Sequence, residues 1–301
     1  MIETLKGPTN SDAIVPAHRR GGAIAGLVLA TLLVATAAHG QIAPPNATGV
    51  AMGHLRLQVP DVEASTAFWV RLGGTRLTVE GTPAVKFPGV LVLLSRGTPS
   101  GLSEGAVLNH VAFRLPSFAP LEAAGFALER SSAVASVASI RSPEGERVEV
   151  FEDKARNIGF TQAPGYNDPV AERHNKPVPT PIALHHIHFY VPEGAVAEAQ
   201  AWYTRLFGGT PGKRDVYDAV DLPGVNLNIS SRPGVQAPTK GRLIDRLGFE
   251  VSNLEAFCQR ARGLGITFDA PCARDASGIV RARLTDPWGT SIELTQGLRR
   301  Y

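Results

Sequence analysis

The chain repeats itself in order, and this repeat constrains the fold more than any single residue does. Residues 54–61 read HLRLQVPD and residues 186–193 read HIHFYVPE. The correspondence ends with PEGERVEV at residues 143–150 and PWGTSIEL at residues 287–294. Between these ends, residues 68–75 match 202–210, residues 87–90 match 222–225, and residues 108–113 match 244–249. An ordered repeat of this kind predicts two copies of one folded unit.

Each copy contains a weaker internal repeat. Residues 54–61 alternate as a strand does, and residues 62–72 follow with helical spacing. Three short strands are expected before the pattern restarts at His110, and a last strand covers residues 147–151. The sequence therefore predicts an α+β fold of four βαβββ units. Two such units supply eight strands, enough for a half-open cup with helices outside.

The repeats predict where the domains lie. A short lead over residues 41–49 precedes a first domain at 50–153, and a second domain covers 184–297. The proline-rich segment 154–183 has no sustained apolar period and is expected to be a linker. Residues 298–301 form a short tail.

Residues 1–40 differ in kind from the rest. Arg19 and Arg20 precede an uncharged apolar stretch at residues 21–38, and small residues then lead to Gln41. A basic region, an apolar region and a small-residue boundary are typical of a signal peptide, so we expect export to the periplasm or beyond. The alternative is an uncleaved membrane anchor, and membrane association is expected only in that case.

Composition excludes some partners. The chain is 44% hydrophobic and 19% charged, which is typical of a globular protein. Its net charge of +3 is spread thinly, and no run of Lys or Arg suggests a nucleic-acid surface.

The only two cysteines are Cys258 and Cys272. Export makes a disulfide possible. The sequence gives no distance between them, and we favour two unpaired thiols.

The motifs together resemble the vicinal oxygen chelate superfamily, which includes glyoxalase I, bleomycin resistance proteins and extradiol dioxygenases. They are the paired βαβββ units, His54 on the first strand, His110 at the restart, and Gly-x-x-Val/Ile-Glu near each end. The stretch LTDPWGTSIEL at residues 284–294 resembles the superfamily most. The resemblance covers nearly all of residues 50–297 and implies two glyoxalase-like half-barrel, or cup, domains. It does not specify the reaction, because one fold hosts many chemistries.

The resemblance also implies a metal site, because each unit of these proteins offers two inward positions to a divalent ion. In this sequence the positions are His54, Leu93, His110 and Glu149 in the first repeat and His186, Asn228, Arg246 and Glu293 in the second. The set His54, His110 and Glu149 suits one divalent ion, which could be Fe, Mn, Zn, Ni or Co. The alternative is that these side chains are hydrogen-bonded in a cup that holds no ion.

Arg246 breaks the pattern of the second repeat. Guanidinium has no lone pair to give a metal, so His186, Arg246, Glu293 and Asn228 are expected to form a degenerate second site. An Arg246–Glu293 ion pair is expected to fill the space, and the alternative is an Arg246 clamp for an anionic substrate. If Arg246 is what prevents metal binding at the second site, Arg246→His is expected to add a second ion.

The sequence leaves the pairing of the four units open. If neighbours in sequence pair, the intact set is His54, His110 and Glu149. If the first unit pairs with the fourth and the second with the third, His186 replaces His54. Since the units can pair within one chain, no oligomer is required.

Other polar residues carry weaker predictions. Arg56, His188 and Tyr190 are candidates for acid–base or substrate contacts. His185 is expected on the outer face of its strand, because successive residues of a strand point to opposite sides. His174 lies in the linker and has no argued role.

The predicted function is an exported metal-dependent enzyme that acts on a small molecule through two adjacent substrate oxygens. It would be a lyase, an isomerase or a dioxygenase. The glyoxalase I reaction is disfavoured, because Leu93 and Asn228 stand where that reaction needs carboxylates. The alternative is a metal-free protein that binds and sequesters a small molecule, as bleomycin resistance proteins do.

Overall fold

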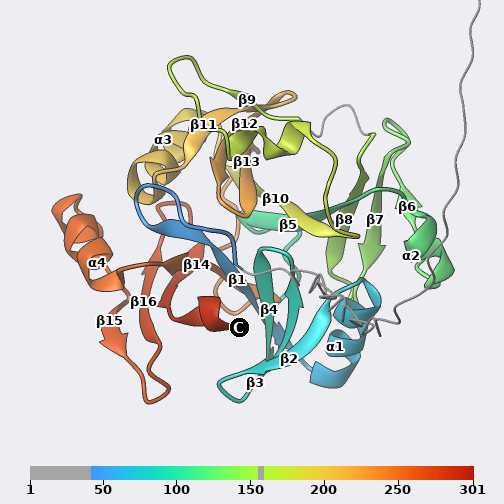
Figure 1. Ribbon diagram of the computed structural model, residues 1–301, viewed down its shortest axis with the longest axis horizontal. Helices are drawn as coiled ribbons and strands as arrows, with labels where there is room; N and C mark the ends of the chain where they lie inside the picture. The colour runs from blue at the N-terminus through green and yellow to red at the C-terminus, as the bar shows by residue number, and fades with distance from the viewer. Residues whose placement is uncertain (1–41, 155–158) are drawn as a thin grey trace, which may run out of the picture. The chain divides into compact units, whose positions relative to one another are not determined.

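A computed structural model describes residues 42–154 and 159–301 (Figure 1). The predicted signal peptide or anchor at residues 1–40 lies outside these ranges. Within them, no helix is long and apolar enough to span a bilayer.

The chain forms the four expected βαβββ units in sequence order. The first contains β1 (Val50–Val59), α1 (Val62–Arg71), β2 (Thr75–Val79), β3 (Thr82–Phe87) and β4 (Val90–Arg96). The second contains β5 (Leu108–Leu115), α2 (Ala119–Ala123), β6 (Glu129–Arg130), β7 (Val137–Arg141) and β8 (Arg147–Glu152). The third contains β10 (Ala183–Val191), α3 (Val196–Phe207), β11 (Thr210–Arg214), β12 (Tyr217–Leu222) and β13 (Val225–Ser231). The fourth contains β14 (Ile244–Val251), α4 (Leu254–Gly263), β15 (Ala270–Arg274), β16 (Val280–Thr285) and β17 (Ser291–Gln296).

Three short elements complete the described structure. The linker contributes β9 (Thr161–Gln162) and a 3-10 turn at Ala171–Asn175, and a second 3-10 turn covers Leu298–Arg300. The predicted α+β fold of two glyoxalase-like sheets is confirmed.

The strands pair across the two repeats rather than within them. An 8-stranded sheet has the order β15-β16-β17-β14-β1-β4-β3-β2, and a 9-stranded sheet has the order β6-β7-β8-β5-β10-β13-β12-β11-β9. The first unit thus joins the fourth, and the second joins the third. Figure 1 shows this in its colours, with blue β1 beside orange β14. We name the two sheets the first–fourth sheet and the second–third sheet.

Units that are neighbours in sequence touch through their apolar faces instead. Trp69 of α1 lies 6.0 Å, between ring centroids, from Phe113 of β5, and Phe207 of α3 lies 4.5 Å from Phe249 of β14. All four side chains are buried, and they belong to one apolar core that includes residues of both sheets. Burial of these rings, worth roughly 1.5–3 kcal/mol each, holds the two units of each repeat together, since no hydrogen-bonded ladder among the described residues joins them.

A β-bulge occurs at the same place in the central strand of each sheet. In β10 the register with β5 shifts between Leu184 and His186, and in β1 the register with β14 shifts between Met52 and His54. The extra residues are His185 and Gly53. Strict alternation fails at a bulge, and His185 is buried with 1% exposure rather than lying outside as the sequence suggested.

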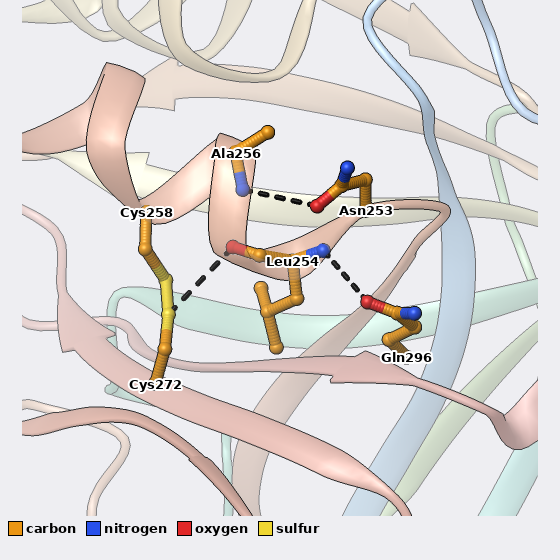
Figure 2. The surroundings of a disulfide bond; sticks show 6 residues. All are labelled: Asn253, Leu254, Ala256, Cys258, Cys272 and Gln296. Carbon is orange, nitrogen blue, oxygen red and sulfur yellow. Dashed lines mark hydrogen bonds between the residues drawn. A yellow bond between two sulfur atoms is a disulfide. The ribbon is translucent and has the colours of Figure 1, made fainter.

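Cys258 of α4 and Cys272 of β15 form a disulfide, contrary to the unpaired thiols that we favoured (Figure 2). Their Cα atoms lie 6.7 Å apart, within the range that a disulfide spans. The start of α4 is fixed nearby, because Asn253 accepts a hydrogen bond from the Ala256 amide and Gln296 accepts one from the Leu254 amide.

Candidate metal centre

The strand registers define which residues of the two sheets are equivalent. His188 lies opposite His110 in one sheet, and Arg56 lies opposite Arg246 in the other. On the neighbouring parallel strand, His188 pairs with Asn228 and Arg56 pairs with Leu93. In the second–third sheet the inward positions are therefore His186, His188, Asn228, His110 and Glu149, and their counterparts in the first–fourth sheet are His54, Arg56, Leu93, Arg246 and Glu293.

Three side chains of the second–third sheet converge on one point. Glu149 Oε1 lies 3.7 Å from His110 Nε2 and 3.6 Å from His186 Nε2. Both distances are too long for hydrogen bonds. Two atoms that bind one ion at about 2.1 Å lie roughly 3.0–3.4 Å apart, so a small closure would place all three around a common ion.

The Nε2 atoms of the two histidines have no other partner in the described structure. His110 Nε2 and His186 Nε2 are both buried and have no hydrogen-bond partner there. A buried nitrogen without a partner is costly, and a metal ion would satisfy both at once. The residues present therefore fit a divalent ion.

The charge states also suit an ion. Burial lowers the pKa of His110, and it lowers that of His186 well below 6.5, so both imidazoles are neutral and keep a lone pair. Burial raises the pKa of Glu149, but its contact with His110 and the charges of Arg147 and Arg214 outweigh this, and the net pKa is lowered. The set is thus two neutral imidazoles and a carboxylate.

His188 lies at the edge of the same set. One ring nitrogen from each of His110, His186 and His188 lies within 4.8 Å of the others. The His188 ring stacks on Tyr190 at 4.9 Å, meets Tyr217 edge-on at 4.9 Å, and its Nε2 lies 2.8 Å from Ser230 Oγ. These contacts fix the ring, so His188 is either a further ligand or a fixed polar group beside the ion.

Asn228 completes the inward face. Its side chain is fully buried, and neither amide atom has a hydrogen-bond partner in the described ranges. The amide oxygen is a suitable ligand for a hard divalent ion.

Polar side chains that lie behind His186 were not predicted from the sequence. His185 Nδ1 lies 2.9 Å from His186 Nδ1, and the His185 ring lies 4.9 Å from that of His174. His174 in turn contacts Asp221 at 2.6 Å. A hydrogen bond from His186 Nδ1 to His185 leaves His186 Nε2 free to bind an ion. No strand pattern could reveal this, because His185 is a bulge residue and His174 comes from the linker.

His110 Nδ1 has two neighbours that compete for it. Asn109 Oδ1 lies 2.9 Å away and accepts, whereas Arg147 Nη2 lies 2.6 Å away and donates. Donation to Asn109 is the arrangement that leaves a lone pair on Nε2, so Asn109 supports metal binding and Arg147 opposes it.

In the first–fourth sheet, contacts between Glu293 and basic side chains occupy the equivalent site. Glu293 Oε2 lies 2.8 Å from His54 Nε2 and 3.2 Å from Arg56 Nε, and Glu293 Oε1 lies 3.9 Å from Arg246. The expected Arg246–Glu293 contact is thus long, and Arg246 lies nearer Asp245, at 3.0 Å. Burial raises the pKa of Glu293, but its contact with His54 and the two guanidinium groups outweigh this and hold the net pKa well below the usual range.

The structure separates His54 from His110 and Glu149, because His54 lies in the other sheet. Because the second unit pairs with the third, the structure brings together the alternative set His110, Glu149 and His186 in place of the set with His54. The grouping of His186 and Asn228 with Arg246 and Glu293 is corrected for the same reason. The His54 ring instead occupies space over Gly248, where an added Cβ would lie 2.2 Å from it.

Known proteins support the resemblance. Residues 183–294 match the family model of the Glyoxalase/Bleomycin resistance protein/Dioxygenase superfamily. No curated protein matches the sequence. The predicted resemblance to the vicinal oxygen chelate superfamily is confirmed: residues 183–294 carry a sequence match, and solved structures share the fold over most of the chain.

Solved structures share the fold at low sequence identity. Glyoxalase I from Zea mays superposes with a TM-score of 0.57 at 15% identity, covering 83% of this chain and 94% of that one. A mutant of it gives a TM-score of 0.58 at 13% identity, covering 84% and 95%. A candidate dioxygenase from Bacillus subtilis subsp. subtilis str. 168 gives 0.53 at 12% identity, covering 85% and 86%. At these identities the likeness shows the fold alone.

Proposed function

We propose that the protein is a metal-dependent enzyme of the vicinal oxygen chelate type that acts on a small molecule. His110, His186 and Glu149 would hold one divalent ion. The observation that carries this is the pair of buried Nε2 atoms without partners, both facing the same carboxylate oxygen. The superfamily fold and the cluster of three histidines support it.

A divalent ion at this site would supply a Lewis acid for two adjacent oxygens of a substrate. The chain's own groups do the rest. Glu149 and the neutral imidazoles orient the site, and His188, fixed by Ser230, presents a ring nitrogen that can hold or release a proton beside the substrate. The reaction class is a lyase, isomerase or dioxygenase.

Metal analysis of the purified full chain tests the proposal. We expect about one ion per chain, and we expect His186→Ala to lose it. The matched control is His54→Ala, which removes the equivalent imidazole, buried to the same extent, from the other sheet. An ion-free wild-type protein that is folded and binds small molecules would instead support the sequestering function.

We also propose that the chain is exported. The disulfide between Cys258 and Cys272 supports this, because such bonds persist in oxidising compartments. The expected result of cell fractionation and N-terminal sequencing is an extracytoplasmic protein that begins at Gln41. A cytoplasmic protein with an intact N-terminus would contradict export, and a membrane-bound one would indicate the anchor.

A further inference from the structure

A cavity of about 250 Å³ opens beside the proposed metal ligands. His110, Glu149 and His188 form one part of its wall, and Arg147, Arg214 and Tyr217 form another. Its volume lies below the roughly 300–1,000 Å³ typical of sites for drug-sized ligands, so it suits a small metabolite.

The wall of this cavity carries an excess of positive charge. Arg214 is 1% exposed, and its guanidinium lies 5.4 Å from the ring centroids of both Phe151 and Tyr217. Burial lowers its pKa to about 10, so it still carries its charge at neutral pH. Arg147 adds a second guanidinium, and Glu149 is the one carboxylate among the residues that line the described cavity.

A bound divalent ion would make this excess larger. Two guanidinium groups and one carboxylate line the cavity, Glu104 Oε1 lies 3.7 Å from Arg147 Nε outside the lining, and the ion would add two positive charges. Charge of one sign in a site of low dielectric constant attracts and orients an anion of the other sign.

The same positions of the other sheet carry no such charge. Arg214 is the last residue of β11 and pairs with Tyr217, and Val79 is the last residue of β2 and pairs with Thr82. Val79 is therefore the counterpart of Arg214. Arg147 starts β8 as Ser291 starts β17. The two arginines are therefore specific to the sheet that holds the proposed metal centre, and the shared fold does not require them.

We propose that the ligand of this cavity carries a second acidic group, a carboxylate or a phosphonate, besides the oxygens that face the ion. This inference rests on the proposed function and names its substrate class. Arg214 and Arg147 would pair with the acidic group, since a guanidinium fork matches the geometry of both oxyanions. Tyr217, whose pKa is raised by burial, keeps its proton and can donate to the same group.

Matched hydroxy acids test the inference on the metal-loaded full chain. Malate and 2-hydroxy-3-phosphonopropanoate carry the second acidic group, and β-malamate has a neutral amide in place of the second carboxylate. We expect calorimetry to show that one of the two dianions binds about 10- to 100-fold more tightly than β-malamate. Which dianion is preferred distinguishes a carboxylate from a phosphonate ligand.

Two variants, each with the residue found at the equivalent position of the first–fourth sheet, test which arginines cause the preference for the dianion. Arg214→Val and Arg147→Ser are each expected to reduce the preference for the dianion by about tenfold or more while the ion is retained. Lys213→Gln is the control, since it removes a charge from the exposed residue next to Arg214 and should leave the preference unchanged.

The ion content is measured first, so two failures can be told apart. An ion-free wild-type chain contradicts the proposed function. Equal affinity for the dianions and β-malamate, with the ion in place, overturns this inference and leaves the proposed function standing. The ligand comparison in the wild-type chain decides the matter even if Arg214→Val does not fold.

Discussion

The two sheets share one backbone plan and differ at three of the five inward positions, one of which has Leu93 in place of Asn228. His54 and Glu293 of the first–fourth sheet occupy the places of His186 and Glu149, yet Arg56 and Arg246 stand where the other sheet has His188 and His110. Guanidinium only donates hydrogen bonds, so it satisfies a carboxylate, whereas a neutral imidazole leaves the carboxylate and its own lone pair for an ion. The same inward positions thus give an ion pair in one sheet and a proposed metal centre in the other.

The residues behind these positions differ as well. The bulge before His186 carries His185, which contacts its Nδ1, while the bulge before His54 carries Gly53, which has no side chain to do so. Ala112 lies opposite His186, whereas Gly248 opposite His54 lets that ring lie directly over the strand. In the second–third sheet His185 therefore contacts His186 from behind, whereas in the first–fourth sheet the His54 ring lies against the backbone of Gly248.

The largest expected contrast comes from the two glutamates. Glu149→Gln should weaken ion binding by more than about 100-fold, which exceeds the loss expected when a group that only hydrogen-bonds to a metal ligand is removed. Glu293→Gln should leave ion binding unchanged and lower the free energy of unfolding by about 1–3 kcal/mol, because the buried His54 and the partly buried Arg56 and Arg246 lose their shared carboxylate. Titration calorimetry and denaturant unfolding measure the two effects, and equal loss of the ion in both variants would contradict the comparison.

The next prediction converts one sheet into the other. Arg56→His, Arg246→His and Gly248→Ala together install the histidines of the second–third sheet and the alanine opposite His186, while Leu93 is kept, and a second ion per chain is expected. Arg246→His alone should add none, which revises the sequence-based expectation, because Arg56 still holds Glu293 at 3.2 Å. Metal analysis checks both variants, and a second ion in the single variant would show that Arg56 is not an obstacle.

His185→Gly should have a smaller effect. It copies the bulge residue of the other sheet and removes the partner of His186 Nδ1, so ion affinity should fall by about 10- to 100-fold. His185→Gln is expected to recover part of that loss because it can still accept a hydrogen bond. Competition with a chelator measures the affinity, and unchanged affinity in His185→Gly would exclude a positioning role.

The smallest effect concerns acid stability of the first–fourth sheet. Because the folded-state pKa of Glu293 is depressed, its stabilisation is complete above its ordinary value of 4.5 and is lost as the pH falls towards the folded value. The difference in unfolding free energy between the wild type and Glu293→Gln should therefore be constant at neutral pH and shrink below about pH 4.5. A difference that stays flat into strong acid would show that the ion pair does not stabilise the fold.

The repeat and the motifs sufficed to predict the four units, because strand and helix periodicity are local properties of the sequence. They also put His110 and Glu149 together under either pairing of the units. The choice between His54 and His186 was beyond the sequence, since pairing depends on long-range packing such as that of Trp69 on Phe113. The bulge at His185 and the approach of His174 from the linker also arise from tertiary contacts that periodicity does not encode.

The anomalous scattering of a crystal soaked in a divalent metal tests the central claim most directly. We predict one strong peak per chain, within bonding distance of His110 Nε2, His186 Nε2 and a Glu149 oxygen, and none beside Glu293. A peak at His54 and Glu293, or a well-ordered second–third site that binds no ion at saturating metal, would contradict the account.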